Sequence, residues 1–194
     1  FDALNGEIAV YDDTLCVGVG NFLNNGNSIL FDGTDYIEIP DNPIWDFGTG
    51  DFTISMWAKH NYVASYNTFI EIGHWTNSII VRQDNPSTIY VYYMGSGYSF
   101  PAPATIGEWF YLTARRQSGQ LQLFINGNQI GSTYSAGQNI QPSGVVRLGS
   151  SVHAGNQKLY GNLDEVSIWN YARSAIDMQF EMENALTGNE PGLK

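Results

Sequence analysis

The chain has 194 residues, of which 14% are charged and 14% are aromatic, and its formal net charge is −11. The length suits one domain with a full hydrophobic core. The acidity disfavours nucleic acid and anionic membranes as partners, and no apolar run reaches the ~18 residues that would predict membrane insertion. The single cysteine, Cys16, excludes a disulfide within the chain and is interpreted as a small buried hydrophobe.

Short apolar alternations separated by turn residues begin near residue 28 and predict β-strands. The first two strands flank Asp32-Gly33, a dipeptide typical of hairpins because both of its residues tolerate positive φ. A strong alternation over 51–59 comes next. Asn126-Gly127 is the strongest hairpin signal in the chain. Further strands are expected over 68–75, 77–84, 88–95, 108–117, 120–127, 128–133, 145–150 and 164–169.

A helix is predicted only near the C-terminal end, over 174–186. Ser174 is a suitable N-cap, and Asp177 stands at the capping-box spacing. Ile176 and Phe180 are four residues apart, so they would share one helix face. Gly and Pro stop this helix, and residues 187–194 are interpreted as a linker toward a further domain. Many short strands with one helix favour an antiparallel sandwich or jelly roll over βαβ units.

Four segments in order resemble the laminin-G-like domains of the concanavalin A-like lectin/glucanase superfamily. They are FDGTDYIEIPDN, DFTISMWAK, GEWFYLTARRQSGQLQLFINGNQIG and LGSSVHAGNQKLYGNLDEVSIWNYARSAIDM. The resemblance implies an all-β, two-sheet antiparallel jelly-roll sandwich with one short C-terminal helix, over residues 1–186. It also implies a longer secreted or cell-surface protein with neighbouring domains, and an extracellular location.

Catalysis is not expected. Retaining glycosidases need two carboxylates about 5–5.5 Å apart, which a strand provides when acids occupy alternate positions. Glu71 stands alone on its strand. Asp164 and Glu165 are adjacent, so on a regular strand they face opposite ways. No G-x-S-x-G or H-E-x-x-H motif is present, and no catalytic residue is predicted.

The resemblance also implies a structural calcium ion. Calcium takes six to eight oxygen ligands, which include backbone carbonyls. In related jelly rolls the Asp that opens the last strand meets carbonyls from the N-terminal strands. Carried over by motif, the ligands are Asp164 and the Asp32–Gly33 turn. The alternative is that Asp164 is a strand-end carboxylate that accepts hydrogen bonds from nearby backbone N–H groups.

Aromatic and polar side chains on one strand face predict a binding surface. If Ile89, Val91 and Tyr93 face the core, Tyr90 and Tyr92 lie on the opposite face. The same alternation along their strands places Glu71 and Arg82 on that opposite face. Trp75 ends a strand at a loop edge. Tyrosine is also an ordinary strand residue, so a structural role is the alternative. The predicted ligand-binding residues are Glu71, Trp75, Arg82, Tyr90 and Tyr92.

These observations lead us to expect a non-catalytic carbohydrate-binding or adhesion module of a secreted or cell-surface multidomain protein. Its partner would be a glycan or an extracellular protein, and it would hold a structural calcium. The first alternative is a structural spacer domain of a surface or appendage protein without a small ligand. The second alternative is a glycan-active enzyme.

Overall fold

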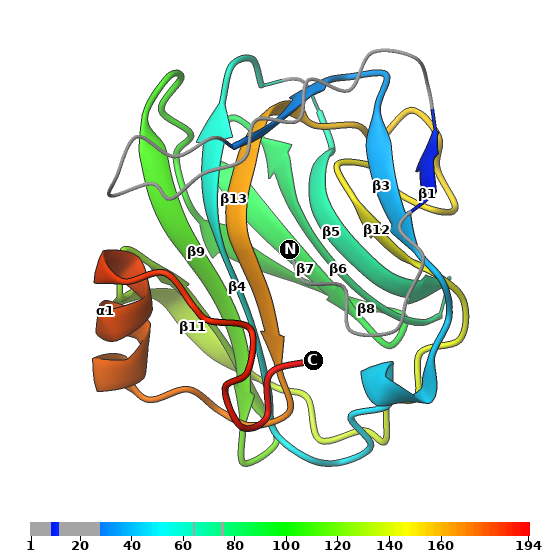
Figure 1. The fold of residues 1–194 in the computed structure, drawn as a ribbon, viewed down its shortest axis with the longest axis vertical. Helices are drawn as coiled ribbons and strands as arrows, with labels where there is room; N and C mark the ends of the chain where they lie inside the picture. The colour runs from blue at the N-terminus through cyan, green and yellow to red at the C-terminus, as the bar shows by residue number, and fades with distance from the viewer. Residues whose placement is uncertain (1–8, 12–27, 64, 75) are drawn as a thin grey trace.

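A computed structural model describes residues 9–11, 28–63, 65–74 and 76–194 (Figure 1). Two antiparallel sheets face each other, as predicted. One sheet has the order β1 (Ala9–Tyr11), β3 (Tyr36–Ile39), β12 (Val146–Leu148), β5 (Asn67–His74), β6 (Asn77–Asn85), β7 (Thr88–Tyr93) and β8 (Ser96–Pro101). The other has the order β11 (Asn128–Ser135), β10 (Gln120–Ile125), β9 (Trp109–Gln117), β4 (Phe52–His60), β13 (Tyr160–Trp169) and β2 (Ile29–Asp32). The expected jelly-roll sandwich is confirmed.

Side-chain alternation explains how the sheets pack. On β7, Ile89, Val91 and Tyr93 are buried in the core, whereas Tyr90 and Tyr92 between them are only half-buried. Successive strand residues point to opposite faces, so each strand gives one set of side chains to the core and another to the surface. The core lies between the two sheets, and the outer face of each sheet is the one directed away from the other sheet.

The two turn dipeptides have different outcomes. Asn126 and Gly127 have φ of 50° and 75° and join β10 to β11 as a hairpin, so that prediction is confirmed. The hairpin predicted at Asp32–Gly33 is wrong, because β2 pairs with β13 and β3 pairs with β12 in the opposite sheet. Asp32 instead accepts a hydrogen bond from the backbone N–H of Thr34 at 2.8 Å, an Asx turn that crosses between the sheets.

Strand β13 is irregular at its acidic pair. Leu163 and Ile168 both face the core although they are five residues apart, so the alternation must shift by one residue between them. The pairing with β4 breaks between Asp164 and Ser167, and Glu165 has φ of 47°. This is a β-bulge. The regular strand that we assumed for the Asp164–Glu165 pair does not exist at this point.

Helix α1 (Ala175–Glu183) confirms the predicted C-terminal helix and its capping box. The Ser174 hydroxyl accepts from the Asp177 backbone N–H at 3.2 Å, and Asp177 accepts from the Ser174 N–H at 2.9 Å. The helix covers the outer face of the six-stranded sheet (Figure 1). Met178 and Glu181 face the sheet, whereas Ile176 and Phe180 are 80% and 55% exposed.

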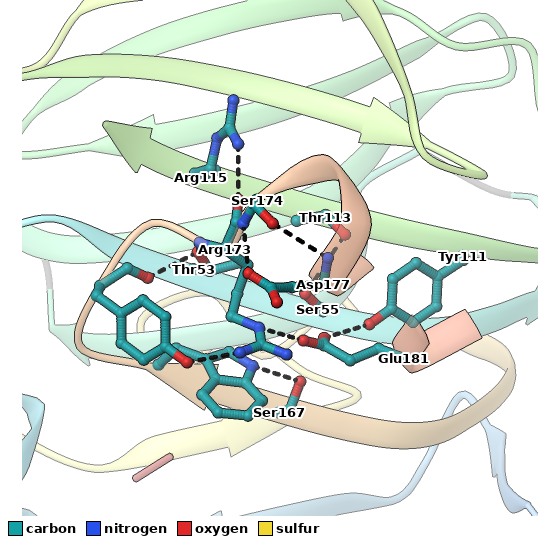
Figure 2. Close-up of polar contacts among 12 residues, drawn as sticks. Thr53, Ser55, Tyr111, Thr113, Arg115, Ser167, Arg173, Ser174, Asp177 and Glu181 are labelled. Carbon is teal, nitrogen blue, oxygen red and sulfur yellow. Dashed lines mark hydrogen bonds and ion pairs between the residues drawn. The ribbon is translucent and has the colours of Figure 1, made fainter. Parts of the chain in front are cut away.

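Polar groups anchor this helix to the sheet (Figure 2). Glu181 accepts a hydrogen bond from the Tyr111 hydroxyl of β9 at 2.8 Å and pairs with Arg173. The Arg173 guanidinium also lies 4.0 Å from the ring centroid of Trp169. Burial raises the pKa of the Tyr111 hydroxyl and of the Glu181 carboxyl. These ionisable groups are enclosed between helix and sheet, so we assign them a structural role.

Residues 187–194, predicted as a linker, are docked against the end of β13 in this structure. The backbone N–H of Asn170 donates to Gly192 at 3.0 Å, and the N–H of Lys194 donates to Ile168 at 2.8 Å. Cys16 lies outside the described residues. Within the described part of the chain, no helix has the length and apolar character needed to span a membrane.

Candidate functional site

The outer face of the seven-stranded sheet carries four of the five predicted ligand-binding residues. Glu71 on β5 lies between Ile70 and Ile72, which are both in the core. Across the sheet, Glu71 is paired with Ile80 and Ile80 with Tyr92, while Arg82 is paired with Tyr90. The fifth predicted residue, Trp75, lies outside the described residues.

Glu71 is fully buried on this face because the connection 149–159 folds over it. One carboxylate oxygen accepts hydrogen bonds from the Ser151 hydroxyl at 2.7 Å and from the Val152 N–H at 2.9 Å. The other oxygen lies 3.0 Å from Nδ1 of His153. In this arrangement Glu71 holds the connection against the sheet, and the connection separates it from solvent.

Arginine and glutamate alternate on the neighbouring strands. Arg147 on β12 lies in register between Glu38 and Glu71. Its guanidinium pairs with Glu38 at 2.5 Å and lies 4.1 Å from the ring centroid of Tyr36. It also donates to the Ser151 carbonyl at 3.1 Å. Arg147 therefore fixes one end of the covering connection.

A second group of side chains on the outer face centres on Arg82. Its guanidinium carbon lies 4.7 Å from the ring centroid of Tyr66 and 5.2 Å from that of Tyr90. The same group donates to Asp84 at 2.9 Å and to the Gln157 side chain at 2.8 Å. We call these five residues the Arg82 cluster. Stacking and hydrogen bonds together leave the guanidinium few conformations, so the cluster is preorganised.

The end of the Tyr90 side chain lies over the edge strand β8. A Cβ atom placed on Gly97 would overlap the Tyr90 ring, so the absence of a side chain at Gly97 lets the ring lie over the backbone. Tyr90 is also paired with Ser99, which is exposed. A half-buried ring beside small exposed residues presents an apolar surface with hydrogen-bonding groups at its rim.

Three members of the Arg82 cluster were not predicted. Tyr66 and Gln157 come from connections, and Asp84 follows Arg82 on the same strand. The spacing of Arg82 and Asp84, two residues apart, could have indicated one face. Nothing in the sequence indicates that residues 66 and 157 approach β6, because their positions depend on how the connections fold.

The predicted calcium ligands are not brought together. Asp32 is paired with Tyr160 on β13, and Asp164 is four residues further along that strand, a separation of about 13 Å. Within the described residues, no group of three or more His, Cys, Asp or Glu side chains could hold a metal ion. The donor set that the resemblance implied does not fit this structure.

Asp164 nevertheless has an unusual environment. Its Oδ1 accepts the Glu165 N–H at 2.9 Å, whereas its buried Oδ2 has no hydrogen-bond partner among the described residues. Burial raises the pKa of the Asp164 carboxyl from 3.8 to about 6. Protonation is one way in which this carboxyl can avoid an uncompensated buried charge.

Comparison with known proteins identifies the family of this fold. Residues 31–179 match a laminin G family model described as the concanavalin A-like lectin/glucanases superfamily, and the chain belongs to that family. No curated protein sequence matches the chain.

Solved structures of the same fold include a domain in complex with a sugar and the binding domain of a toxin. Domain 4 of AbnA, an extracellular arabinanase from Geobacillus stearothermophilus, was solved with arabinotriose. It is 16% identical, with a TM-score of 0.66, and the match covers 90% of this chain and 86% of that domain. A Bacteroides ovatus protein provisionally assigned to carbohydrate binding is 17% identical with a TM-score of 0.68, over 94% of this chain. The binding domain of botulinum neurotoxin serotype G is 13% identical with a TM-score of 0.69, over 92%.

The present chain spans about half the length of the Bacteroides and neurotoxin structures, 51% and 46% respectively. At these identities the likeness shows the shared fold alone.

Proposed function

We propose that this domain is a non-catalytic carbohydrate-binding module and that sugar units stack on the Arg82 cluster. The observation that carries the proposal is the contact of one guanidinium with two tyrosine rings, one of which lies over Gly97 of β8. The apolar face of a sugar ring can pack on a tyrosine, while Arg82, Asp84 and Gln157 can hydrogen-bond its hydroxyl groups. The sugar-bound AbnA domain of the same fold supports this function.

The carboxylates of the outer face favour binding over catalysis. Glu38 pairs with Arg147, and Asp84 pairs with Arg82. Glu71 is buried beneath Ser151 and His153. A retaining glycosidase needs two carboxyl groups about 5–5.5 Å apart at the scissile bond, one of which attacks as a nucleophile. Each of these three carboxylates is instead committed to a partner within the protein.

We also propose an extracellular location within a multidomain protein. The support is the family, together with the extracellular enzyme and the toxin among its structural neighbours.

A glycan array followed by calorimetric titration tests the proposed function. Tyr90→Ala removes the ring, and Gly97→Ala displaces it by placing a Cβ in the space that it occupies. Gly137→Ala is the matched control, because a Cβ there meets nothing within 4 Å. We expect both Tyr90→Ala and Gly97→Ala to weaken glycan binding about ten-fold, and Gly137→Ala to bind as the unchanged protein does.

Three outcomes would contradict the proposal. An array without specific signal would favour the spacer alternative. Binding that survives both Tyr90→Ala and Gly97→Ala would place the site elsewhere on the domain. Release of reducing sugar by the unchanged protein would restore the enzyme alternative.

A further inference from the structure

We infer that the ligand is an extended, uncharged sugar chain that continues from the Arg82 cluster to a second aromatic contact made by Tyr62 and Tyr160. This inference rests on the proposed function, because it assumes that the Arg82 cluster binds sugar. It adds a second contact site and a ligand class to that function.

Tyr62 and Tyr160 form an exposed aromatic pair at one end of the sandwich. Their ring centroids are 5.7 Å apart and the ring planes meet at 89°, an edge-to-face contact. Tyr62 is 60% exposed and Tyr160 is 37% exposed. Large exposed aromatic side chains in contact with each other are a common feature of binding surfaces.

The backbone and a neighbouring glycine fix this pair. The N–H groups of Asn61 and Tyr62 both donate to the Tyr160 carbonyl, at 2.9 and 3.2 Å. A Cβ on Gly33 would overlap the Tyr160 ring, and Gly33 has φ of 90°. The Tyr160 ring is therefore seated on the crossing turn between β2 and β3. Tyr90 is seated on Gly97 in the same manner.

Polar groups suited to sugar hydroxyls flank the pair. The Asn61 side chain donates to the Asn162 side chain at 3.1 Å, and Asn162 donates to the Ser28 hydroxyl at 3.0 Å. Amide groups that are already oriented by hydrogen bonds retain further donor and acceptor capacity. The combination of an apolar ring surface and oriented amides matches that of the Arg82 cluster.

One short connection joins the two aromatic sites. Residues 61–66 link β4 of the six-stranded sheet to β5 of the seven-stranded sheet, and they supply Tyr62 to one site and Tyr66 to the other. Four residues span at most about 14 Å. The Tyr66 N–H donates to the Asp84 carbonyl at 3.1 Å, and the Asn67 side chain donates to the Tyr62 carbonyl at 3.4 Å. Tyr62 and Tyr66 therefore lie within the reach of one short oligosaccharide.

The charge of the protein points to an uncharged ligand. The net charge is −11, and five of the eight basic residues are arginines. Every arginine bonds to groups of the protein: Arg82 to Asp84, Arg115 to Gln122, Arg116 to backbone carbonyls, Arg147 to Glu38 and Arg173 to Glu181. Lys158 donates to the Thr34 carbonyl. A uronic acid or sulfated chain would meet a repulsive field with few available cations.

Titrations with oligosaccharides of one to six units test the inference. The probes are arabino-, xylo- and cello-oligosaccharides, with oligogalacturonates as the anionic series. We expect affinity for a neutral series to rise with chain length. Tyr62→Ala should weaken hexasaccharide binding about ten-fold and leave disaccharide binding unchanged. Tyr62→Phe should restore the affinity, because it keeps the ring.

The outcomes separate this inference from the proposed function. If Tyr62→Ala binds every length as the unchanged protein does, while Tyr90→Ala is impaired, the second contact is wrong and the first site stands. If no neutral series binds, the proposed function itself fails. If oligogalacturonates bind as tightly as the neutral series, the inference that the ligand is uncharged is wrong. Phe180→Ala, on the helix of the other sheet, is the control for losing an exposed aromatic side chain.

Discussion

Asp164 combines a buried oxygen that has no described partner with a raised pKa of about 6. In the unfolded chain its pKa is near 3.8, so the folded state favours the protonated form. The stabilisation from this preference is fully present below about pH 4 and is lost as the pH rises through about 6. At neutral pH the ionised carboxylate therefore destabilises the fold.

Asp164→Asn removes this penalty and should stabilise the protein at high pH. Full burial would make the shift equivalent to about 3 kcal/mol, but partial exposure screens the charge, and we expect about 1–2 kcal/mol. Urea unfolding at two pH values measures the effect. The variant should exceed the unchanged protein in free energy of unfolding near pH 8 and match it near pH 4.

Asp41→Asn removes one carboxylate from an exposed position and serves as the control. It should show no comparable gain between the two pH values. A destabilised Asp164→Asn variant at pH 8 would contradict the expectation. So would a calcium-dependent rise in melting temperature that disappears in this variant, because it would make the ionised Asp164 a calcium ligand.

The unusual character of the Asp164–Glu165 pair could be predicted from the sequence, but its environment could not. The two acids are adjacent in a chain of which only 14% is charged, and an apolar alternation follows them. The bulge that turns Glu165 to φ of 47° depends on pairing with β4, a strand about 100 residues away in sequence. The regular alternation of strand side chains therefore could not predict which way Asp164 and Glu165 point.

At the scale of elements, α1 depends on the buried pair between Arg173 and Glu181. Glu181→Ala leaves Arg173 without its carboxylate partner and Tyr111 without its acceptor. Breaking one side of a buried ion pair costs about 3–5 kcal/mol, and we expect about 3 kcal/mol here. Chemical unfolding measures this loss. Glycan affinity should be unchanged, because the helix lies on the other sheet.

Glu183→Ala is the matched control for this variant. Glu183 belongs to the same helix but is exposed, so its removal should change stability by less than about 0.5 kcal/mol. Equal effects of the two substitutions would show that the Arg173–Glu181 pair contributes nothing beyond helix propensity.

The existence of α1 was predictable, whereas the face that it buries was not. Ser174 and Asp177 form a capping box that is readable from their spacing. Ile176 and Phe180 are exposed, whereas Met178 and Glu181 face the sheet, where Glu181 bonds to Tyr111 and Arg173. The spacing of Ile176 and Phe180 alone therefore does not predict the buried face, because a polar anchor such as Glu181 can decide which face packs on the sheet.

The two turn dipeptides also show that a local sequence signal does not determine which strands pair. Asn126–Gly127 and Asp32–Gly33 are both dipeptides that favour positive φ, yet only the first makes a hairpin. A dipeptide sets how the chain bends. Which strand lies alongside the next is decided by the packing of the whole sandwich, so Asp32–Gly33 could equally well lead into the opposite sheet.

At the scale of the whole molecule, the alternation of side chains along each strand was enough to predict one shared face. That face carries Glu71, Arg82, Tyr90 and Tyr92. This alternation is a local property of a strand, so a single sequence reveals it. The connection that covers Glu71 and supplies Gln157 comes from a distant part of the chain. Its position could not be predicted, and it determines which part of the face is covered.

The charge distribution of the whole molecule yields a last prediction, on salt. The arginines are committed to protein groups, so sugar binding to the Arg82 cluster should not rely on long-range attraction.

Raising the salt concentration from about 0.05 to about 0.5 M shortens the Debye length several-fold. We expect the dissociation constant for a neutral hexasaccharide to change less than about two-fold, because stacking and short hydrogen bonds are weakly screened. Calorimetry at both salt concentrations measures the dissociation constant. An oligogalacturonate is the comparison, and its weak binding should strengthen as salt screens the repulsion. Neutral-sugar affinity that falls steeply with salt would instead show that an ionic contact with the protein dominates recognition.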